Sequence, residues 1–452
     1  MSGLKKGKSN DEIRLSDHFT YGRLLRFTIP SVLMMIFISI YSAVDGFFVS
    51  NYVGIIPFSA INLMMPAAMI LGAVGFMFGA GGSALVSATL GARQHARANR
   101  IFSMLIYVAC GVGVILAILG VLFLEPIAIL LGATPELLPD CLVYGRILLA
   151  AIPAFILQNV FQSFLITAEK PALGLWITVA AGVTNMVLDA LFILVFHWGL
   201  AGAAAATALA QCVGGVIPLV YFSRKNSSLL RLGKTTLDMK ALGITCSNGL
   251  SELVSNISMS LVSILYNLQL IRLAGDRGIA AYGAVMYISF VFAAVFLGYS
   301  IGVAPVIGFH FGAKNHSELK GLFRKSNILV LSSGIILGVV AFAFAEPLAG
   351  LFVSSDKALL EMTVTAFCFY AISVLFSGFG IFGSAFFTAL NNGIVSATIS
   401  FLRTLVFQVA AVLILPVFFD LEGVWYSLFV AEILASILTA VMYAVKKKEY
   451  RY

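Results

Sequence analysis

The sequence predicts an all-α integral membrane protein with twelve transmembrane helices arranged in two six-helix lobes. Three observations support this fold class. Sixty per cent of the 452 residues are apolar and only 11% are charged, whereas about a quarter of the residues in a soluble domain are charged. Twelve stretches reach the length of about 20 apolar residues that a membrane crossing needs, and the two halves of the chain resemble each other.

The twelve predicted spans follow one another with short polar breaks between them. In chain order they cover residues 24–50, 57–85, 101–124, 141–167, 172–197, 200–222, 247–273, 279–309, 326–352, 362–390, 394–418 and 423–445. Each is long enough to cross the bilayer as a helix, in which every backbone polar group is satisfied within the span.

An internal repeat relates the two halves of the chain. A shift of 221 residues aligns them without a gap from about residue 54 to residue 221; LGARQHARANRIF at 90–102 then meets FGAKNHSELKGLF at 311–323. FLEPIAIL at 123–130 meets FAEPLAGL at 344–351 at the same offset. Because six helices per half is an even number, both halves enter the membrane from the same side. The lobes are therefore expected to be related by a pseudo-two-fold axis along the membrane normal.

The distribution of basic residues predicts the limits of the lobes and their orientation. We expect a cytoplasmic N-terminal tail at 1–20, an N-lobe at 21–222, a hydrophilic linker at 223–245, a C-lobe at 246–446 and a cytoplasmic tail at 447–452. Lysine and arginine concentrate in the tails and in the loops on the side of the tails, and only Arg272, Arg277 and Lys357 fall in the opposite loops. By the positive-inside rule, both termini are predicted to be cytoplasmic in the inner (plasma) membrane. The net charge of +8 then reflects topology and contact with lipid headgroups, and it does not imply nucleic acid.

Four polar residues stand out in the first half because the second half does not have them. At the offset of 221, Asp45 aligns with Tyr266, Asn185 with Val406, Asp189 with Ala410 and Thr207 with Leu428. The fold can therefore be built without this polar set. Since acidic residues inside a membrane are costly, the set indicates a function.

Helical geometry brings these four residues to a similar depth. Asn185 and Asp189 are separated by one helical turn and share one face. Asp189 and Thr207 lie at equal distances from the break near Trp198, about 13 Å from the outer surface at a rise of about 1.5 Å per residue. Asp45, near the outer end of the first span, reaches a comparable depth.

Oxygen-rich groups of this kind suit a coupling cation. The four residues could bind Na⁺, and two neighbouring carboxylates could instead share a proton, because two negative charges so close together repel each other. A buried hydrogen-bond network that joins the first, fifth and sixth spans is the alternative. The sequence does not decide between H⁺ and Na⁺.

Other polar residues in the spans are candidates for a substrate cavity or for structural pairs. Glu252 could face the space between the lobes and contact a cationic substrate, or it could lie at the membrane interface. Gln158, Gln162 and Gln211 are further candidates for lining the cavity. Arg146, Arg403 and Glu432 are expected to make structural ion pairs or to lie near helix ends.

No catalytic apparatus is visible in the sequence. LGKTT at 232–236 lacks the first glycine of a phosphate-binding loop, and FGAGGSAL at 78–85 is typical of close helix packing. The five histidines form no metal-binding motif. We therefore expect no enzyme activity and no cofactor.

The chain resembles the multidrug and toxic compound extrusion (MATE) family over nearly its full length. The resemblance rests on the two six-helix halves, the aspartate in IYSAVDGFFVS, and TNMVLDALFI followed by GLAGAAAATALAQ. It implies a monomeric secondary antiporter that exports bulky, often cationic compounds in exchange for H⁺ or Na⁺, with the cation at Asp45, Asn185, Asp189 and Thr207. Because the second half has no acid in its tenth span, the chain is closer to the DinF-like and MepA-like branches.

Two other transporter classes fit the sequence less well. A lipid-linked oligosaccharide flippase of the same superfamily would need a more basic central cavity, for which the spans offer only Arg146 and Arg403. A major-facilitator transporter would carry an Asp-Arg motif that GARQHARANR lacks.

Overall fold

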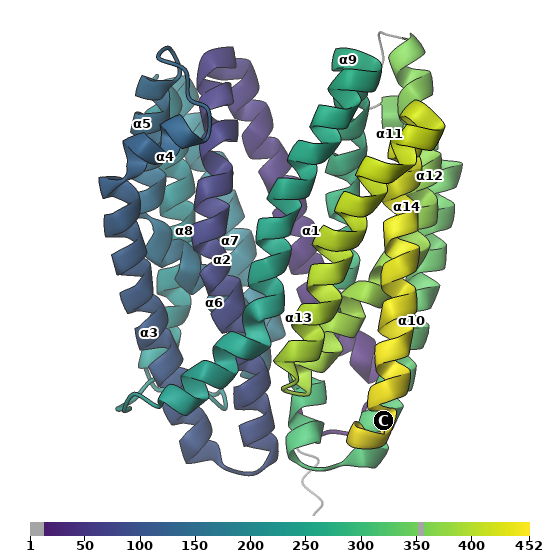
Figure 1. Cartoon of the computed structure of the whole chain (residues 1–452). Helices are drawn as coiled ribbons and strands as arrows, with labels where there is room; N and C mark the ends of the chain where they lie inside the picture. Colours follow the sequence, from purple (N-terminus) through teal and green to yellow (C-terminus); the bar gives the residue numbers. More distant parts are fainter. Residues whose placement is uncertain (1–12, 351–356) are drawn as a thin grey trace, which may run out of the picture.

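A computed structural model of the chain describes residues 13–350 and 357–452. The described residues form helices and connecting loops, with no strand among them. Figure 1 shows two groups of helices side by side, one from the first half of the chain in purple and blue and one from the second half in green and yellow. The predicted all-α, two-lobe architecture is confirmed.

The N-lobe contains the first six spans. Its helices are α1 (Tyr21–Tyr52), α2 (Ile55–Gly91), α3 (His95–Leu122), α4 (Leu124–Leu130), α5 (Leu138–Ala150), α6 (Ile152–Thr167), α7 (Pro171–Asp189), the π-helix η1 (Ala190–Val195) and α8 (Gly199–Ser223). Helices α5 and α6 form one span that bends by 50° between them. Pro153 in the first turn of α6 explains the bend, because proline cannot donate the hydrogen bond that would continue α5.

The C-lobe repeats this layout with longer continuous helices. They are α9 (Met239–Gly312), α10 (His316–Ala343), α11 (Ala345–Gly350), α12 (Lys357–Ala389), α13 (Gly393–Phe401), the π-helix η2 (Leu402–Phe407) and α14 (Gln408–Tyr450). Helix α9 contains two spans, because Gly275 interrupts it with φ 60° and ψ −150°. Asp420, with φ 48° and ψ −130°, divides α14 in the same way.

The number of spans agrees with the sequence. Ten helical segments of the described chain are long and apolar enough to cross a membrane, and the bent pair α5–α6 adds another. One of the ten runs without division from Gly393 to Tyr450. The break at Asp420 separates it into two spans, so that each lobe contains six.

The internal repeat is visible in the limits of the helices. Helix α3 begins at His95 and α10 at His316, which are 221 residues apart. The preceding turns match as well, since Arg93 and Lys314 both have a positive φ, of 60° and 54°. The two halves therefore fold by the same local rules, as the alignment predicted.

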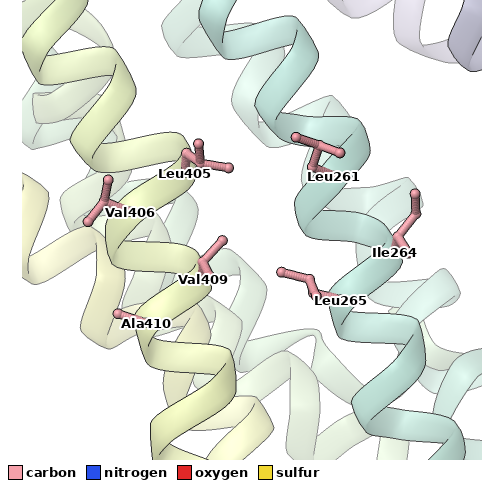
Figure 2. A pocket seen from close by; sticks show the side chains of 7 residues that line it. All are labelled: Leu261, Ile264, Leu265, Leu405, Val406, Val409 and Ala410. Atoms are coloured by element: carbon pink, nitrogen blue, oxygen red, sulfur yellow. The ribbon is translucent and has the colours of Figure 1, made fainter.

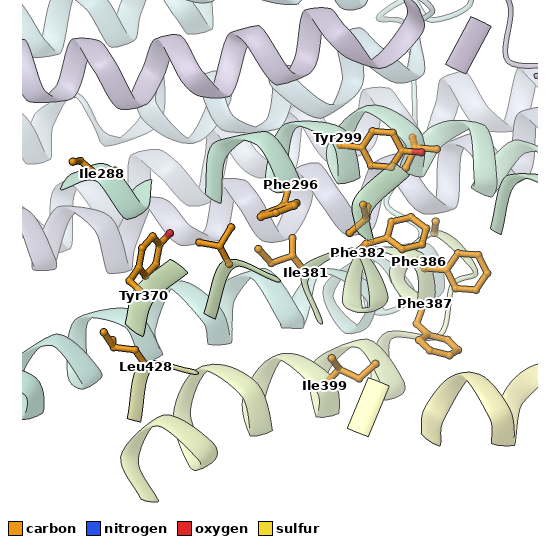
Figure 3. Close-up of a cluster of buried hydrophobic side chains, with 14 of the residues drawn as sticks. Ile288, Phe296, Tyr299, Tyr370, Ile381, Phe382, Phe386, Phe387, Ile399 and Leu428 are labelled. Atoms are coloured by element: carbon orange, nitrogen blue, oxygen red, sulfur yellow. The ribbon is translucent and has the colours of Figure 1, made fainter. Parts of the chain in front are cut away.

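Each lobe has its own hydrophobic core. Figure 3 shows the C-lobe core, in which Phe296, Tyr299, Phe382 and Phe386 are labelled. The corresponding N-lobe cluster is built from α2, α3, α5, α6 and α8. The C-lobe core also includes Leu24 and Phe27 of α1, so the first turns of α1 pack with the C-lobe.

The lobes meet through close helix contacts near the ends of the bundle that carry both termini. We call this end the terminal side; Figure 1 marks the C-terminus there. A Cβ atom added to Gly81 or Gly91 of α2 would collide with the backbone of Thr245 or Phe309 in α9. In the opposite direction, a Cβ on Gly312 would collide with the backbone of Ala88. Backbones can approach so closely because glycine has no side chain.

The segment before α1 also joins the lobes on the terminal side. The backbone N–H of Leu15 donates to Glu169 in the N-lobe at 2.6 Å. The backbone N–H of Phe19 donates to Glu318 of α10 at 2.9 Å, and His18 bonds to the same carboxylate at 2.6 Å. Leu15 and Phe19 are fully buried. Residues 15–19 thus form hydrogen bonds with Glu169 of the N-lobe and with Glu318 of the C-lobe.

A buried ion pair lies inside the C-lobe. Arg403 of η2 donates two hydrogen bonds to Glu432 of α14, at 2.9 Å and 3.0 Å. The side chains are 17% and 9% exposed. This parallel, two-bond geometry is the strongest arrangement that an arginine and a carboxylate can adopt. The expectation that Arg403 and Glu432 make a structural pair is confirmed.

We predict that Gly91→Leu disrupts the terminal-side contact. The leucine must displace the Phe309 backbone, and overpacking of this kind typically costs about 1–3 kcal/mol. The purified variant should unfold several degrees below the parent in a thermal scan in detergent. Gly111→Leu on α3 is the matched control, since nothing lies within 4 Å of a Cβ there. Equal unfolding temperatures for the two variants would contradict the role of this contact.

We also predict that Glu432→Gln destabilises the C-lobe by about 3–5 kcal/mol, because it leaves the Arg403 guanidinium buried without its counter-charge. Replacing both residues by leucine should recover most of that loss. The measurement is again thermal unfolding of the purified protein. A double variant less stable than Glu432→Gln would show that the pair has a role beyond mutual neutralisation.

Candidate functional site

The structure brings the acidic side chains of the N-lobe together. The carboxyl groups of Asp45 on α1 and Asp189 on α7 lie within direct interaction distance of each other, and Asn185 lies beside Asp45. Helix α1 packs along α7, and α7 packs against α8. We call Asp45, Asn185 and Asp189 the acidic cluster.

The acidic cluster is buried and its polar atoms lack protein partners. Asp189 is 0% and Asn185 2% exposed, whereas Asp45 is partly buried. Both carboxylate oxygens of Asp189, one oxygen of Asp45 and the amide nitrogen of Asn185 have no hydrogen-bond partner. Buried polar atoms are nearly always satisfied in folded proteins. A proton or a cation bound between the two carboxyl groups would satisfy these atoms and reduce the repulsion between the negative charges.

Local sequence features explain how α1 and α7 come so close. Gly182 of α7 faces Phe37 and Tyr41 of α1, and a Cβ atom at this position would collide with the Phe37 ring. One turn after Asn185, the α-helical hydrogen bonding of α7 ends at Asp189 and continues as the π-helix η1. A π-helical segment often marks a functional site because it loosens the backbone and turns side chains to new directions.

Thr207 and Gln211 lie one turn apart on α8, which packs against α7 and η1. Both are partly buried, and the side-chain oxygen of Gln211 has no partner. These two side chains supply an additional hydroxyl and an amide on the helix next to the acidic cluster.

Two tyrosines near the acidic cluster were not recognised from the sequence. The hydroxyl of Tyr144 on α5 lies in electrostatic range of both Asp45 and Asp189, and Tyr41 lies in range of Asp45. Tyr41 precedes Asp45 by one turn and so shares its face. At the offset of 221, Tyr41 aligns with Val262 and Tyr144 aligns with Thr365. The comparison of the halves that selected the aspartates could have found them too.

Glu252 lies close to the point where the lobes separate. It follows Gly249 of α9 by three residues, and Gly249 touches the backbone of Met77 in α2. Residues three apart share a helix face, so Glu252 stands just beyond this contact, towards the side away from the termini. It is partly buried, and its backbone carbonyl accepts a hydrogen bond from Asn256 at 2.8 Å.

Gln158 and Gln162 lie inside the N-lobe. Each is 8% exposed, and both line a small cavity between α6, α7 and α8. Gln211 lies on the same helix as the cavity residues Gly214 and Pro218. The three glutamines therefore belong to the interior of one lobe.

The corresponding place in the C-lobe is apolar. Tyr266 donates to Gln408 at 2.8 Å and is bonded to Ser427, so its hydroxyl is satisfied within the lobe. Val406 and Ala410, the counterparts of Asn185 and Asp189, line an open groove of about 670 Å³ between α9 and α14. Figure 2 shows its seven side chains, all of which are hydrocarbon. The two lobes share a scaffold and differ in the chemistry of this position.

The side chains offer an oxygen set for a monovalent cation or a proton. Among the described residues, no group of three or more histidine, cysteine, aspartate or glutamate side chains is arranged to hold a metal ion. The acidic cluster contains two carboxylates and an amide, which suit a weakly bound Na⁺ or a shared proton.

Comparisons with known proteins agree with this architecture. The MatE family model matches the chain twice, at residues 30–191 and 253–414, once in each lobe. The multidrug export protein MepA of Staphylococcus haemolyticus is 26% identical over 430 residues, which cover 94% of each chain. MepA of Staphylococcus aureus is 26% identical over 421 residues, covering 92% of this chain and 91% of that protein.

Solved structures show the same fold. An outward-facing multidrug resistance MATE family transporter superposes with a TM-score of 0.92 at 22% identity, over 98% of this chain and 100% of that chain. A transporter of the MOP superfamily from Pyrococcus furiosus superposes with a TM-score of 0.91 at 22% identity, over 99% of this chain and 100% of that chain. With a family match in each lobe and the same fold throughout, this chain belongs to the MatE family of multidrug and toxic compound extrusion transporters.

Proposed function

We propose that this transporter is a secondary antiporter that exports lipophilic, often cationic compounds in exchange for inward H⁺ or Na⁺. The observation that carries the proposal is the pair of adjacent carboxyl groups of Asp45 and Asp189, of whose four oxygens three are buried without a hydrogen-bond partner. Such a pair is unstable as two bare charges, so its environment favours the binding of one cation. The MepA relatives are described as multidrug export proteins, which supports drugs as the exported class.

Cation binding would act through α1. Neutralising Asp45 and Asp189 removes the repulsion between α1 and α7 and allows α1 to repack. Pro30 interrupts the hydrogen bonding of α1 near the terminal side, where Thr28 and Val32 touch Gly302 and Gly298 of α9. A bend there would change the contact between the lobes. Cation occupancy and the opening of the terminal side would thus be coupled by one helix.

The substrate would occupy the space between the lobes, next to Glu252. A carboxylate at this place favours cationic compounds. With both termini cytoplasmic, the close contacts on the terminal side would seal the cytoplasmic end while the other end is open. We further propose that the protein works as a monomer in the cell inner membrane, with lipids around it and no bound cofactor.

A lipid-linked oligosaccharide flippase is less consistent with the arrangement of charges. A pyrophosphate needs free cationic side chains, and Arg403 is already paired with Glu432 inside the C-lobe. Arg146 is exposed on α5. Neither side chain is placed to bind an anionic substrate between the lobes.

We predict that Asp45→Asn and Asp189→Asn each lower gradient-driven exchange at least roughly tenfold, which corresponds to a barrier about 1.4 kcal/mol higher for the coupled step. Asparagine keeps the size of the side chain but removes the charge that cation binding must compensate. Purified variants in liposomes, checked by size-exclusion chromatography, should be tested for dye uptake under an imposed H⁺ or Na⁺ gradient. Parent-like exchange by both variants would make the cluster a structural network only.

The second lobe provides the control for this experiment. Ala410→Asp introduces a carboxylate at the position equivalent to Asp189, in apolar surroundings. We expect that it does not restore exchange when combined with Asp189→Asn, because Tyr266 and Val406 cannot complete a cation site. Restored exchange would show that the position of the acid matters less than its presence.

We also predict that Glu252→Gln weakens the export of cationic dyes severalfold while export of a neutral compound of similar size changes little. The carboxylate attracts a positive charge, and glutamine cannot replace that attraction. The measurement is the apparent affinity for each compound in liposomes under one fixed gradient. An equal loss for both compounds would assign Glu252 to structure or to coupling.

A further inference from the structure

The interior of the N-lobe contains a small cavity between three helices. Gln158 and Gln162 come from α6, Thr178 from α7, and Gly214 and Pro218 from α8. The other lining residues are Phe161, Leu165, Gly174 and Ile177. The cavity belongs to one lobe only and does not lie between the two lobes.

At the cavity, one side-chain oxygen lacks a partner and one backbone carbonyl lacks its usual helical donor. The side-chain oxygen of Gln158 is buried without a hydrogen-bond donor. The carbonyl of Gly214 would normally accept from the N–H of residue 218, but Pro218 has no N–H to give. Gly214 also lies against Gln158, since an added Cβ would come within 2.7 Å of its Cδ. Two acceptors therefore converge here, next to the Thr178 hydroxyl.

The volume of the cavity fits one water molecule. About 10 Å³ is open to the centre of a water-sized sphere, which is close to the minimum for one bound water. The carbonyl, the two amides and the hydroxyl offer the two to four partners that a buried water needs. A Na⁺ ion that keeps several of its own waters would need more room than this.

The cavity lies between the acidic cluster and the terminal side. Thr178 precedes Asp189 by eleven residues on the same helix, or about 16 Å at the helical rise of about 1.5 Å per residue. Asn185 and Gln211 occupy intermediate levels, and each has a buried polar atom without a partner. Asp189, Asn185, Gln211, Gln158 and Thr178 thus form a row of polar side chains that descends through the N-lobe; we call it the polar row.

The C-lobe shows that the fold does not need this row. At the offset of 221, Gln158 aligns with Phe379 and Thr178 with Ile399. Pro218 aligns with Thr439, whose hydroxyl donates to the carbonyl of Ala435 at 2.8 Å and so satisfies the counterpart of the Gly214 carbonyl. Gly383, the counterpart of Gln162, packs directly on Thr439. The equivalent space in the C-lobe is filled, and the counterpart of the Gly214 carbonyl has a donor there.

We propose that this cavity holds an ordered water, and that the coupling ion is a proton that leaves the acidic cluster through the polar row inside the N-lobe. The inference rests on the proposed antiport, and it identifies H⁺ as the ion that is exchanged for the substrate. The O–H bond of a protonated carboxyl breaks, a row water accepts the proton, and neighbouring waters pass it on until hydronium reaches the terminal side. The carboxylate keeps the electron pair. The amides and the hydroxyl hold the waters and do not themselves change protonation.

The row is closed in this structure, because the cavity has room for one water and apolar side chains bound it. A continuous water chain therefore requires α6, α7 and α8 to separate slightly. Gly174, Gly214 and Pro218 give α7 and α8 places to bend at the cavity. Because the row is closed in this state, a proton cannot cross the N-lobe without an accompanying exchange of substrate.

The test uses Thr178→Val, which removes the hydroxyl at nearly constant volume, and Thr178→Ser, which retains it. In liposomes with a trapped pH dye, ethidium added outside should drive H⁺ movement through the parent. We expect Thr178→Val and Gln158→Leu to slow this movement at least roughly tenfold, with Thr178→Ser close to the parent. Equilibrium binding of ethidium should change little in all three, since the row is not part of the substrate space. Phe379→Leu in the C-lobe is the matched control.

Each outcome has a distinct meaning. Parent-like H⁺ movement in both Thr178→Val and Gln158→Leu overturns the route. Ethidium exchange in the parent that follows a Na⁺ gradient alone overturns the route and leaves the antiport intact, whereas no exchange with either ion overturns the proposed function. As a measurement that needs no variant, X-ray hydroxyl-radical labelling should modify Phe161 and Pro218 beside the water and leave Phe379 unmodified. If Phe161 and Pro218 are not labelled, the cavity holds no bound water and that part of the proposal is wrong.

Discussion

The contact between the carboxyl groups of Asp45 and Asp189 is the interaction on which the proposed exchange depends. Asp45 and Asp189 belong to different helices, and both are placed where solvation is weak. Two negative charges in such a place repel each other strongly, so the distance between α1 and α7 responds to whether one charge is neutralised. In the proposed function, a proton or a cation would stabilise this pair of carboxyl groups in the N-lobe.

The two lobes show how one scaffold serves two purposes. They share helix limits, turn conformations and core composition. In the C-lobe, charge is neutralised internally by the Arg403–Glu432 pair, and the tyrosine at the position of Asp45 is fully hydrogen-bonded. In the N-lobe, carboxylates and amides are left without partners. We interpret the C-lobe as the rigid half and the N-lobe as the half that exchanges ions.

Close backbone contacts connect this chemistry with the arrangement of the lobes. Glycines on α2 and α9 let the backbones touch on the terminal side, and residues 15–19 bond to Glu169 and to Glu318 across the same end. Contacts made by glycine depend steeply on distance, because no flexible side chain can take up a displacement. A small bend of α1 near Pro30 is therefore enough to change whether these contacts fit.

The number of spans, the six-plus-six repeat and the choice of Asp45, Asn185 and Asp189 as candidate residues all follow from the amino-acid sequence. These results follow from properties that are local along the chain: apolar length, basic loops, and a constant offset between equivalent residues. The meeting of Asp45 with Asn185 and Asp189 was also predictable, since helical rise sets the depth of each residue.

Which helix faces meet becomes known only when the helices are packed together. These spans are apolar on all sides, so the pattern of residues does not show which face is turned inwards. For this reason the sequence did not place Tyr144 beside the aspartates or Gln158 and Gln162 inside the N-lobe. It predicted structural pairs for Arg403 and Glu432 without showing that they pair with each other. The cavity at Pro218 could not be predicted from the sequence either. The missing N–H of a proline becomes important only where the carbonyl that it leaves without a donor faces another polar group. The rotation of each helix is set by packing against its neighbours, and that information is distributed over the whole chain.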